Sequence, residues 1–212
     1  MTMFKLISAT PSPYARKVRI TLFEKDLPFE LITEVPWDST TQTPQYNPLE
    51  KLPVLIPPEP AKPVYESHYI LEWLEAKYPD PPLLPKDVDA KLFAKQVEVV
   101  SDGICDALVL LFFEKQRAER SPAWEARQMR KVDGGMKALA EWAGDREFMI
   151  GEQLTLADIA AGTVCGYLNV RWPDYPWKDR HPNLARYCER LEGRESFKKT
   201  VPSPQTIKDR IV

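Results

Sequence analysis

The organisation of this chain is clearest at Ser12-Pro13-Tyr14-Ala15-Arg16-Lys17-Val18, which follows the short apolar run Phe4-Lys5-Leu6-Ile7. Ser12 is a favourable N-cap, because its oxygen can accept a backbone N–H of the first helical turn. Pro13 suits the first helical position, where a missing N–H has no cost. The stretch therefore predicts a hydroxyl at the positive end of a helix, beside a strand end. Such a place favours an anion, including a bound thiolate.

The first third of the chain alternates strand and helix patterns. We expect strands at 4–7, 29–35, 52–56 and 64–65, and helices at 13–25 and 67–78. Val18, Ile20, Leu22 and Phe23 are the predicted inward residues of the first helix, and Ser67 is the predicted cap of the second. The order is βαβ-ββα, which predicts an α/β domain.

The composition changes after Tyr78. Four prolines between 79 and 86 indicate a linker, and no strand pattern follows it. Helices are expected at about 87–119, from Ser121 to Gly144, from Thr155, and from His181 to near Gly193. The predicted organisation is a domain at 1–78, a linker at 79–86 and an all-helical domain at 87–212.

One helix start in the second domain is strongly specified. Thr155-Leu156-Ala157-Asp158 is a capping box in which Asp replaces the usual Glu or Gln, and Leu154 and Ile159 stand where a hydrophobic staple closes the turn. We assign this element a structural role, and expect loss of the cap to cost about 1 kcal/mol.

Composition narrows the function classes. The chain has 212 residues, with 29 basic and 31 acidic side chains and no run of like charge, so nucleic acid and acidic membrane surfaces are poor candidate partners. Its apolar runs are too short to span a bilayer, and residues 1–5 lack the apolar segment of a signal peptide. These features predict a cytoplasmic protein.

Cysteine and histidine give no metal or redox signature. Cys105, Cys165 and Cys188 lie far apart in sequence, and His68 and His181 lack metal-ligand spacing. We expect all five side chains only to pack or to cap helices, and we expect no metal.

Three segments of the first domain carry a family likeness: Ser12-Pro13-Tyr14, Lys51-Leu52-Pro53-Val54 and Glu66-Ser67. Together with the proline-rich linker and the Thr155–Asp158 element, they resemble the cytosolic glutathione transferases, and the likeness covers essentially the whole chain. It implies a thioredoxin-like N-terminal domain with a mixed four-stranded sheet, a helical bundle at the C-terminal end, and glutathione as co-substrate.

The resemblance also implies roles for individual residues. Ser12 would hold the glutathione sulfur, and Pro53 would be a cis-proline that turns the Leu52 backbone toward the ligand, ahead of Val54. Ser67 and Glu66 would bind the γ-glutamyl carboxylate and amine, and Lys51 the glycyl carboxylate. Glu50 departs from the family, where many relatives have glycine.

The implied chemistry is thiolate stabilisation. A thiol with a pKa of about 8.5 is mostly protonated at neutral pH, and lowering that pKa by about two units takes about 2.7 kcal/mol. One charge-assisted hydrogen bond and a helix terminus can supply this amount. Thr10 is an alternative donor to Ser12. Because position 12 is not cysteine, conjugation is favoured over thiol transfer.

The electrophile site and the exact activity stay open in the sequence. Tyr14, Leu108, Leu111, Phe112, Tyr167 and Trp172 are candidates for an apolar cleft, although an aromatic stripe at helical spacing more often forms core. Asp102 is a candidate that would reach glutathione across a homodimer. The expected function is conjugation of glutathione to a small electrophile. The alternatives are a non-catalytic glutathione-binding or protein-interaction module, or a glutathione-dependent isomerase, dehalogenase or ether-cleaving enzyme.

Overall fold

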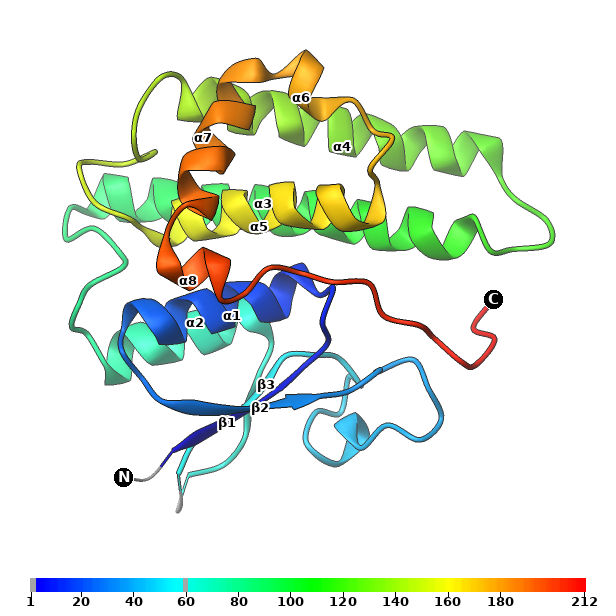
Figure 1. Ribbon diagram of the computed structural model, residues 1–212, viewed down its shortest axis with the longest axis horizontal. Coiled ribbons are helices and arrows are strands. Elements are labelled where there is room, and N and C mark those ends of the chain that lie inside the picture. Colours follow the sequence, from blue (N-terminus) through cyan, green and yellow to red (C-terminus); the bar gives the residue numbers. More distant parts are fainter. Residues whose placement is uncertain (1–2, 59–60) are drawn as a thin grey trace. The chain divides into compact units, whose positions relative to one another are not determined.

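The computed structural model describes residues 3–58 and 61–212 of the chain (Figure 1). The chain divides into two compact units. The first comprises Met1–Leu83 and Glu195–Arg210, and the second comprises Leu84–Arg194 and Ile211–Val212. The sequence places the C-terminal residues with the helical domain, whereas Glu195–Arg210 belong to the first unit.

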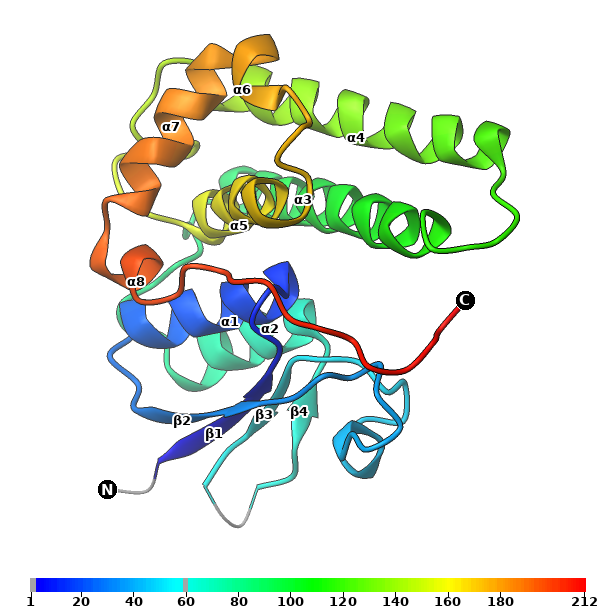
Figure 2. The ribbon, with the colours of Figure 1, turned by 45° about the vertical axis from the view of Figure 1, so that its right-hand side comes forward.

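A four-stranded mixed sheet forms the framework of the first unit. Its strands are β1 (Phe4–Ser8), β2 (Phe29–Thr33), β3 (Val54–Ile56) and β4 (Val64–Tyr65), in the order β2-β1-β3-β4. β1 runs parallel to β2 and antiparallel to β3, and β3 runs antiparallel to β4. Helices α1 (Pro13–Glu24) and α2 (Ser67–Lys77) lie on one face of this sheet (Figure 2). A short 3-10 turn, η1 (Thr43–Gln45), interrupts the loop after β2. The predicted α/β arrangement is confirmed.

Helix α1 buries a different set of side chains from the predicted one. Val18, Ile20 and Leu22 are fully buried as expected, but Phe23 is 37% exposed. Arg16 is buried instead, because its guanidinium has polar partners inside: its Nη2 donates to the Phe197 carbonyl at 3.3 Å. A periodicity count treats a basic residue as a surface residue and therefore misses such a position.

The last residues of the chain return to the first unit. Helix α8 (Glu195–Lys198) is followed by residues 199–210, which are here called the C-terminal strap. The helix and the strap lie beside α1 and the loop after β2 (Figures 1 and 2). The Thr10 hydroxyl donates to the Ser203 carbonyl at 3.1 Å, and the Ser203 N–H donates to the Thr10 carbonyl at 3.3 Å. The Gln205 amide donates to the Glu34 carbonyl at 3.0 Å.

The far end of the strap is held by the loop after β2. The buried Asp38 carboxylate accepts the N–H of Lys208 at 2.8 Å and that of Asp209 at 3.3 Å. In return, the Asp209 carboxylate accepts hydrogen bonds from Ser39, which hold the pKa of Asp209 below its usual value. Backbone donors thus satisfy the buried carboxylate, and the strap is fixed at both ends.

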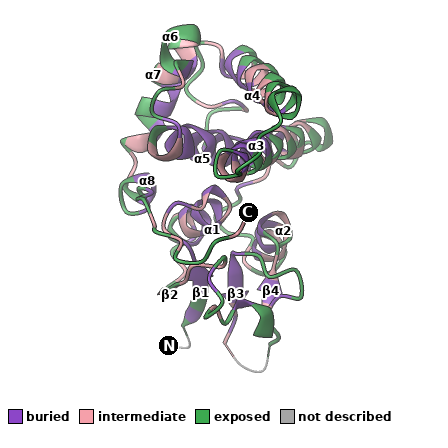
Figure 3. Ribbon diagram, turned by 90° about the vertical axis from the view of Figure 1, so that its right-hand side faces the viewer, coloured by how far each residue is buried: buried purple, intermediate pink, exposed green. Residues whose placement is uncertain are grey.

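The second unit is helical. It contains α3 (Val88–Glu114), α4 (Pro122–Ala143), α5 (Leu156–Arg171), α6 (Trp177–Arg180) and α7 (Pro182–Glu192). Helix α5 is buried over most of its length and forms the centre of this unit (Figure 3). The predicted starts at Ser121 and His181 are confirmed, as are the ends at Gly144 and Gly193. Helices α6 and α8 have 4 residues each, which is too short for a hydrophobic periodicity that could predict a helix.

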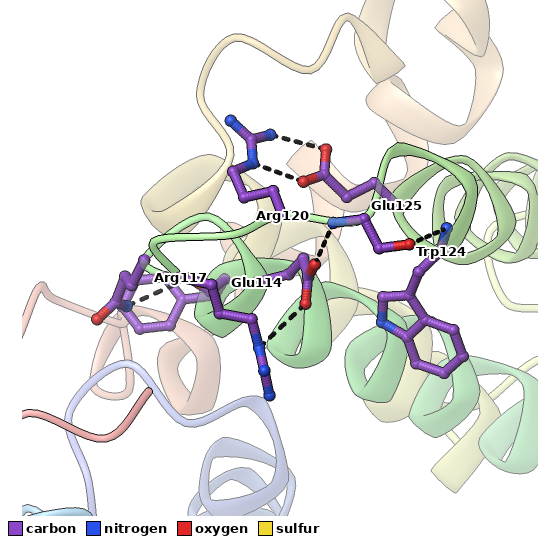
Figure 4. A network of polar contacts seen from close by, with 8 residues as sticks. Glu114, Arg117, Arg120, Trp124 and Glu125 are labelled. Carbon is purple, nitrogen blue, oxygen red and sulfur yellow. Dashed lines mark hydrogen bonds and ion pairs between the residues drawn. The ribbon is translucent and has the colours of Figure 1, made fainter.

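Helix α3 ends five residues earlier than expected. The buried Glu114 carboxylate accepts the Ser121 N–H at 2.7 Å and pairs with Arg117 at 3.2 Å, so the chain turns back at once (Figure 4). Arg120 and Glu125 then form a two-pronged ion pair at 2.6 and 2.7 Å across the start of α4. Side-chain acceptors at this turn therefore end a helix that the apolar pattern alone continues.

Asp158 of the capping box at Thr155 accepts more hydrogen bonds than the sequence pattern predicts. Asp158 is fully buried and accepts the Thr155 N–H at 2.7 Å and hydroxyl at 2.8 Å, as predicted for a reciprocal cap. It also accepts the Met149 N–H at 2.8 Å and the Tyr187 hydroxyl. This carboxylate consequently joins α5, the preceding loop and α7.

The expectation that all the cysteines only pack is wrong for two of them. Cys165 of α5 and Cys188 of α7 form a disulfide, 23 residues apart in sequence, while Cys105 is free and buried. The two cysteines come together because α5 and α7 pack on each other. A sequence separation of this size carries no signature of its own.

Candidate active site

Three strand ends bring the candidate residues of the first unit together. In the observed register, Ile7 lies opposite Val54, and Val54 lies opposite Tyr65. One step further along each strand, Ser8 of β1, Pro53 before β3 and Glu66 after β4 meet at the same end of the sheet. The topology therefore gathers the β1–α1 turn, the Lys51–Pro53 loop and the start of α2, which the sequence singles out separately.

Ser12 is the N-cap of α1, as predicted. Its backbone is extended (φ −65°, ψ 117°), and its Oγ accepts the Ala15 N–H at 3.2 Å. The Ser12 N–H in turn donates to the Ala9 carbonyl, which fixes the turn. A hydroxyl that accepts one hydrogen bond still has its own proton to donate. The half-buried Ser12 can therefore present a donor at the positive end of α1.

The neighbouring hydroxyls are placed differently. The Thr10 proton is directed to the Ser203 carbonyl in the C-terminal strap. The Ser8 hydroxyl is buried and lies 3.4 Å from the Ala9 carbonyl. Tyr14 is half-buried and follows Pro13 in the first turn of α1. Of this group, Ser12 combines partial exposure with a hydroxyl proton that no described hydrogen bond uses.

The loop before β3 is held rigidly. The Leu52–Pro53 bond is cis, as the resemblance implies. Leu52 and Val54 point into an apolar cluster with Ile7 and Ala9, so only their backbone groups are available to a ligand. Val54 is fully buried.

Asn47 organises the loop that carries Lys51. Its buried amide donates to the Lys51 carbonyl at 2.8 Å, and its side-chain oxygen accepts the Leu49 N–H at 2.9 Å. Glu50 adopts φ 56°, a backbone conformation that glycine adopts more readily than a residue with a Cβ. Lys51 itself is exposed. In the sequence, Asn47 carries only a turn signal, because it stands directly before Pro48.

The cap of α2 differs from the predicted one. Glu66, with φ 73°, is the N-cap, and its carboxylate accepts the His68 N–H at 3.2 Å. Ser67 is the first helical residue, and its hydroxyl is 1% exposed with no hydrogen-bond partner among the described residues. A buried hydroxyl without a partner is uncommon in proteins. Its place at a helix N-terminus is one that suits an anionic group.

The proposed electrophile residues of the second unit are mostly core. Leu108, Leu111, Tyr167 and Trp172 are buried. Burial raises the pKa of Tyr167, so its hydroxyl stays protonated. Phe112 is half-buried, with the Arg171 guanidinium 4.6 Å from its ring centre. This burial favours the alternative of a packed aromatic stripe for four of these side chains.

Asp102, which the sequence analysis gives as a candidate ligand across a dimer, is half-buried in α3 and has a partner within the chain. Among the described residues, no group of three or more His, Cys, Asp or Glu is arranged to hold a metal ion. The same residues include no helix long and apolar enough to cross a membrane.

Comparisons with known proteins identify the relatives of this chain. Residues 6–82 match the family model of the glutathione S-transferase N-terminal domain, and residues 122–190 match that of the C-terminal domain. The uncharacterized GST-like protein YibF of Escherichia coli is 34% identical over 200 residues, covering 93% of this chain and 98% of YibF.

Solved structures agree with these matches. A glutathione S-transferase from Methylobacterium radiotolerans, in complex with glutathione sulfonate, is 62% identical, with a TM-score of 0.97 and coverage of 100% of both chains. One from Methylobacillus flagellatus, with glutathione bound, is 36% identical, with a TM-score of 0.89 and coverage of 94% of this chain and 99% of that one.

Proposed function

This chain belongs to the glutathione S-transferase family, and on that premise we propose that it binds glutathione in its first unit and conjugates the tripeptide, through its sulfur, to a small electrophile. The observation that carries the proposal is the buried Ser67 hydroxyl without a partner, at the same end of the sheet as the Ser12 cap. Glutathione has an anionic end and a sulfur that match these two positions.

Each part of glutathione has a suitable partner in the first unit. The Ser67 hydroxyl and the N-terminus of α2 would receive the γ-glutamyl carboxylate, and the exposed Glu66 carboxylate would pair with the neighbouring amine. The Leu52 backbone beside the cis bond would pair with the middle of the tripeptide like an added strand. Lys51 would meet the glycyl carboxylate by charge attraction. Two relatives were solved with glutathione sulfonate or glutathione bound, which supports glutathione as the ligand.

Ser12 would act as a hydrogen-bond donor to the sulfur. The thiol proton leaves to solvent, and the hydroxyl and the α1 N-terminus stabilise the thiolate that remains. The sulfur lone pair then attacks an electrophilic carbon, forming a C–S bond, while a leaving group departs with its bonding electrons. Ser12 forms no covalent bond and needs no base. The substrate is a small, apolar electrophile.

The decisive test compares Ser12 variants that differ in capping. Ser12→Ala removes both the donor and the cap, whereas Ser12→Gly removes the donor and retains most of the cap, since glycine is a tolerable N-cap. Glutathione affinity is measured by calorimetry, and turnover is measured with an activated aryl chloride. Both variants should keep binding and lose turnover about 10²-fold, as for removal of a single donor elsewhere.

A pH profile separates donor loss from misfolding. The pKa of bound glutathione, followed by thiolate ultraviolet absorbance, should rise by about one unit in both Ser12 variants, because the N-terminus of α1 still favours the thiolate. Thr10→Val is the matched control, and it should leave that pKa unchanged. If Thr10→Val abolishes turnover and Ser12→Gly does not, the donor is Thr10. Tight glutathione binding with no turnover on a broad electrophile panel would identify a binding module instead.

We also propose that the protein is a homodimer. Several large apolar side chains of the long helix α3 are exposed, namely Val88, Leu92 and Val99. Covering such side chains in a partner interface is favourable. Light scattering at micromolar concentration tests this assignment, and a monomer would contradict it.

A further inference from the structure

The C-terminal strap, which passes beside α1 (Figure 2), is attached to the chain on both sides of Ser12. Two residues before Ser12, the Thr10 carbonyl accepts the Ser203 N–H at 3.3 Å, and the Thr10 hydroxyl donates to the Ser203 carbonyl at 3.1 Å. Four residues after Ser12, the Arg16 Nε donates to the Thr200 hydroxyl at 3.4 Å. The turn that carries the Ser12 hydroxyl is therefore held from outside at each of its ends.

The attachment through Arg16 is buried and well satisfied. Arg16 is 1% exposed and Thr200 is 0% exposed. The Thr200 hydroxyl directs its own proton to carbonyls of α8 at 2.8 and 3.2 Å, so its lone pairs are available to Arg16. The Phe197 carbonyl also accepts from the Arg16 Nη2 at 3.3 Å. Hydrogen bonds from a charged donor are stronger than those between neutral groups, so this attachment resists displacement.

The far end of the strap is anchored by a loop that is itself braced. In the loop after β2, the Glu34 carboxylate accepts the hydroxyls of Thr41 and Thr43 at 2.6 and 3.0 Å. The buried Asp38 carboxylate of the same loop accepts the Lys208 N–H at 2.8 Å. The strap is consequently held beyond the β1–α1 turn as well as beside it, which keeps it against that turn.

The Ser12 hydroxyl is the group whose position this arrangement controls. Its Oγ accepts the Ala15 N–H at 3.2 Å, and the Ser12 N–H donates to the Ala9 carbonyl at 3.1 Å. These two contacts fix the hydroxyl within the turn, whereas the strap fixes the turn from outside. A functional donor has to lie within about 0.5 Å of its productive position, and a misplacement of about 1 Å can cost about 10²-fold in rate.

We propose that the strap positions the Ser12 hydroxyl against the glutathione sulfur, with Ser203 and Asp38 as the positioning residues. This inference rests on the proposed function, because it takes Ser12 as the hydrogen-bond donor to the thiolate. Ser203 acts through its backbone groups on the β1–α1 turn, and Asp38 acts by holding the far end of the strap. Loosening the strap weakens the stabilisation of the thiolate and leaves the proposed partners of the two glutathione carboxylates in place.

The test breaks the main-chain contact at residue 203 in the full-length protein. Ser203→Pro removes the N–H that the Thr10 carbonyl accepts, and prolines at 202 and 204 already flank this position. It should raise the pKa of bound glutathione by about half a unit, which is half of the shift expected on removing the donor. Ser203→Ala is the matched control, because the described hydrogen bonds of Ser203 use only its backbone groups, and it should leave that pKa unchanged. Thr10→Val also keeps the main-chain bond, and its pKa should likewise be that of wild type.

Binding and turnover should respond differently to Ser203→Pro. At about pH 5.5, roughly one unit below the lowered pKa, bound glutathione is chiefly a thiol, so a rise of half a unit reduces the thiolate and the turnover about threefold. The dissociation constant for glutathione, measured by calorimetry at the same pH, should stay unchanged, because thiol binding does not depend on stabilisation of the thiolate. A strap that served only stability would change the free energy of unfolding in urea and leave the pKa at its wild-type value.

A double-mutant cycle shows whether the effect passes through Ser12. In a Ser12→Gly background no donor is left to misplace, so Ser203→Pro should cause no further rise of the pKa. In Ser203→Pro alone, amide hydrogen exchange should be faster at Ala15, whose N–H donates to the Ser12 Oγ. Asp38→Asn is a milder second variant, because a neutral amide oxygen accepts less strongly than a carboxylate. It should shift the pKa in the same direction by a smaller amount, and it carries the same comparison if Ser203→Pro does not fold.

The outcomes separate this inference from the proposed function. A raised pKa in Ser12→Gly, with wild-type values in both Ser203→Pro and Asp38→Asn, would overturn the positioning role and leave the proposed function intact. An equal rise on Ser203→Pro with and without the Ser12 side chain would overturn it as well. If Ser12→Gly itself leaves the pKa unchanged, Ser12 is not the donor, and the donor assignment and this inference are both wrong.

Discussion

Replacing Asp158 with alanine should destabilise the protein far more than the loss of an ordinary helix cap. The carboxylate accepts two hydrogen bonds from Thr155, one from the Met149 N–H and one from the Tyr187 hydroxyl, and it is fully buried. Its removal leaves several buried donors without an acceptor, each costing about 1–3 kcal/mol. The relief of a buried charge offsets part of this cost, and we expect a net loss of about 3–5 kcal/mol.

Two further variants show how much of that loss of stability comes from the individual hydrogen bonds of Asp158. Thr155→Val removes one donor and keeps the carboxylate with its other partners, so it should cost about 1 kcal/mol. Asp158→Asn keeps one oxygen for Met149 and Tyr187 but turns an amide toward Thr155. It should therefore fall between the other two. Asp145→Ala is the control, because the exposed Asp145 makes only a surface pair, and its effect should stay within about 0.5 kcal/mol.

Urea unfolding followed by circular dichroism gives the required quantity. The free energy of unfolding is compared at matched slopes, since a changed slope indicates a changed denatured state. If Asp158→Ala costs no more than Thr155→Val, then the contacts to Met149 and Tyr187 add nothing. The carboxylate would in that case be only a cap, and the reasoning from its four donors would be refuted.

Three other outcomes follow from the structure. Glu50→Gly should raise stability by about 0.5–1 kcal/mol in thermal melts, because φ 56° is strained for a residue with a Cβ; an unchanged or lower melting temperature would count against that strain. Burial raises the pKa of Tyr167 and Tyr187, so the folded state keeps protons that the unfolded state loses above about pH 10, and the free energy of unfolding should decline as pH rises past that point. Tyr167→Phe should reduce this decline, and an identical pH dependence in that variant would contradict it. Thiol titration in denaturant without reductant should find only Cys105 reactive, and three reactive thiols would show that the other two cysteines merely pack.

The regular elements could be predicted because local rules determine them. Pro13 behind a serine cap predicts the start of α1, and Thr155 with Asp158 predicts the start of α5. The mixed four-stranded sheet and the grouping of Ser12, Pro53 and Ser67 in one site follow from the family resemblance, whereas the strand order comes from the structure. The Glu66 cap was missed, because a positive φ at a non-glycine residue leaves no signal in the sequence.

Other features that the sequence does not indicate depend on partners far away along the chain. Arg16 is buried only because the Phe197 carbonyl and Thr200 receive its guanidinium, more than 180 residues away. The C-terminal strap has no regular secondary structure, so it has no periodicity to detect. The hydrogen bond from Arg19 of α1 to the Lys199 carbonyl likewise spans most of the chain, and no local pattern indicates it.

The strap also sets an order of events during synthesis. The hydrogen bond between Thr10 and Ser203 joins residues 193 positions apart, and the one from Arg16 to Phe197 joins residues 181 positions apart. A ribosome making this polypeptide synthesises the four strands, which lie between residues 4 and 65, long before Phe197, so Arg16 has no Phe197 carbonyl to bond with during most of translation. Completion of the first unit therefore has to wait until Phe197 and Ser203 have been synthesised.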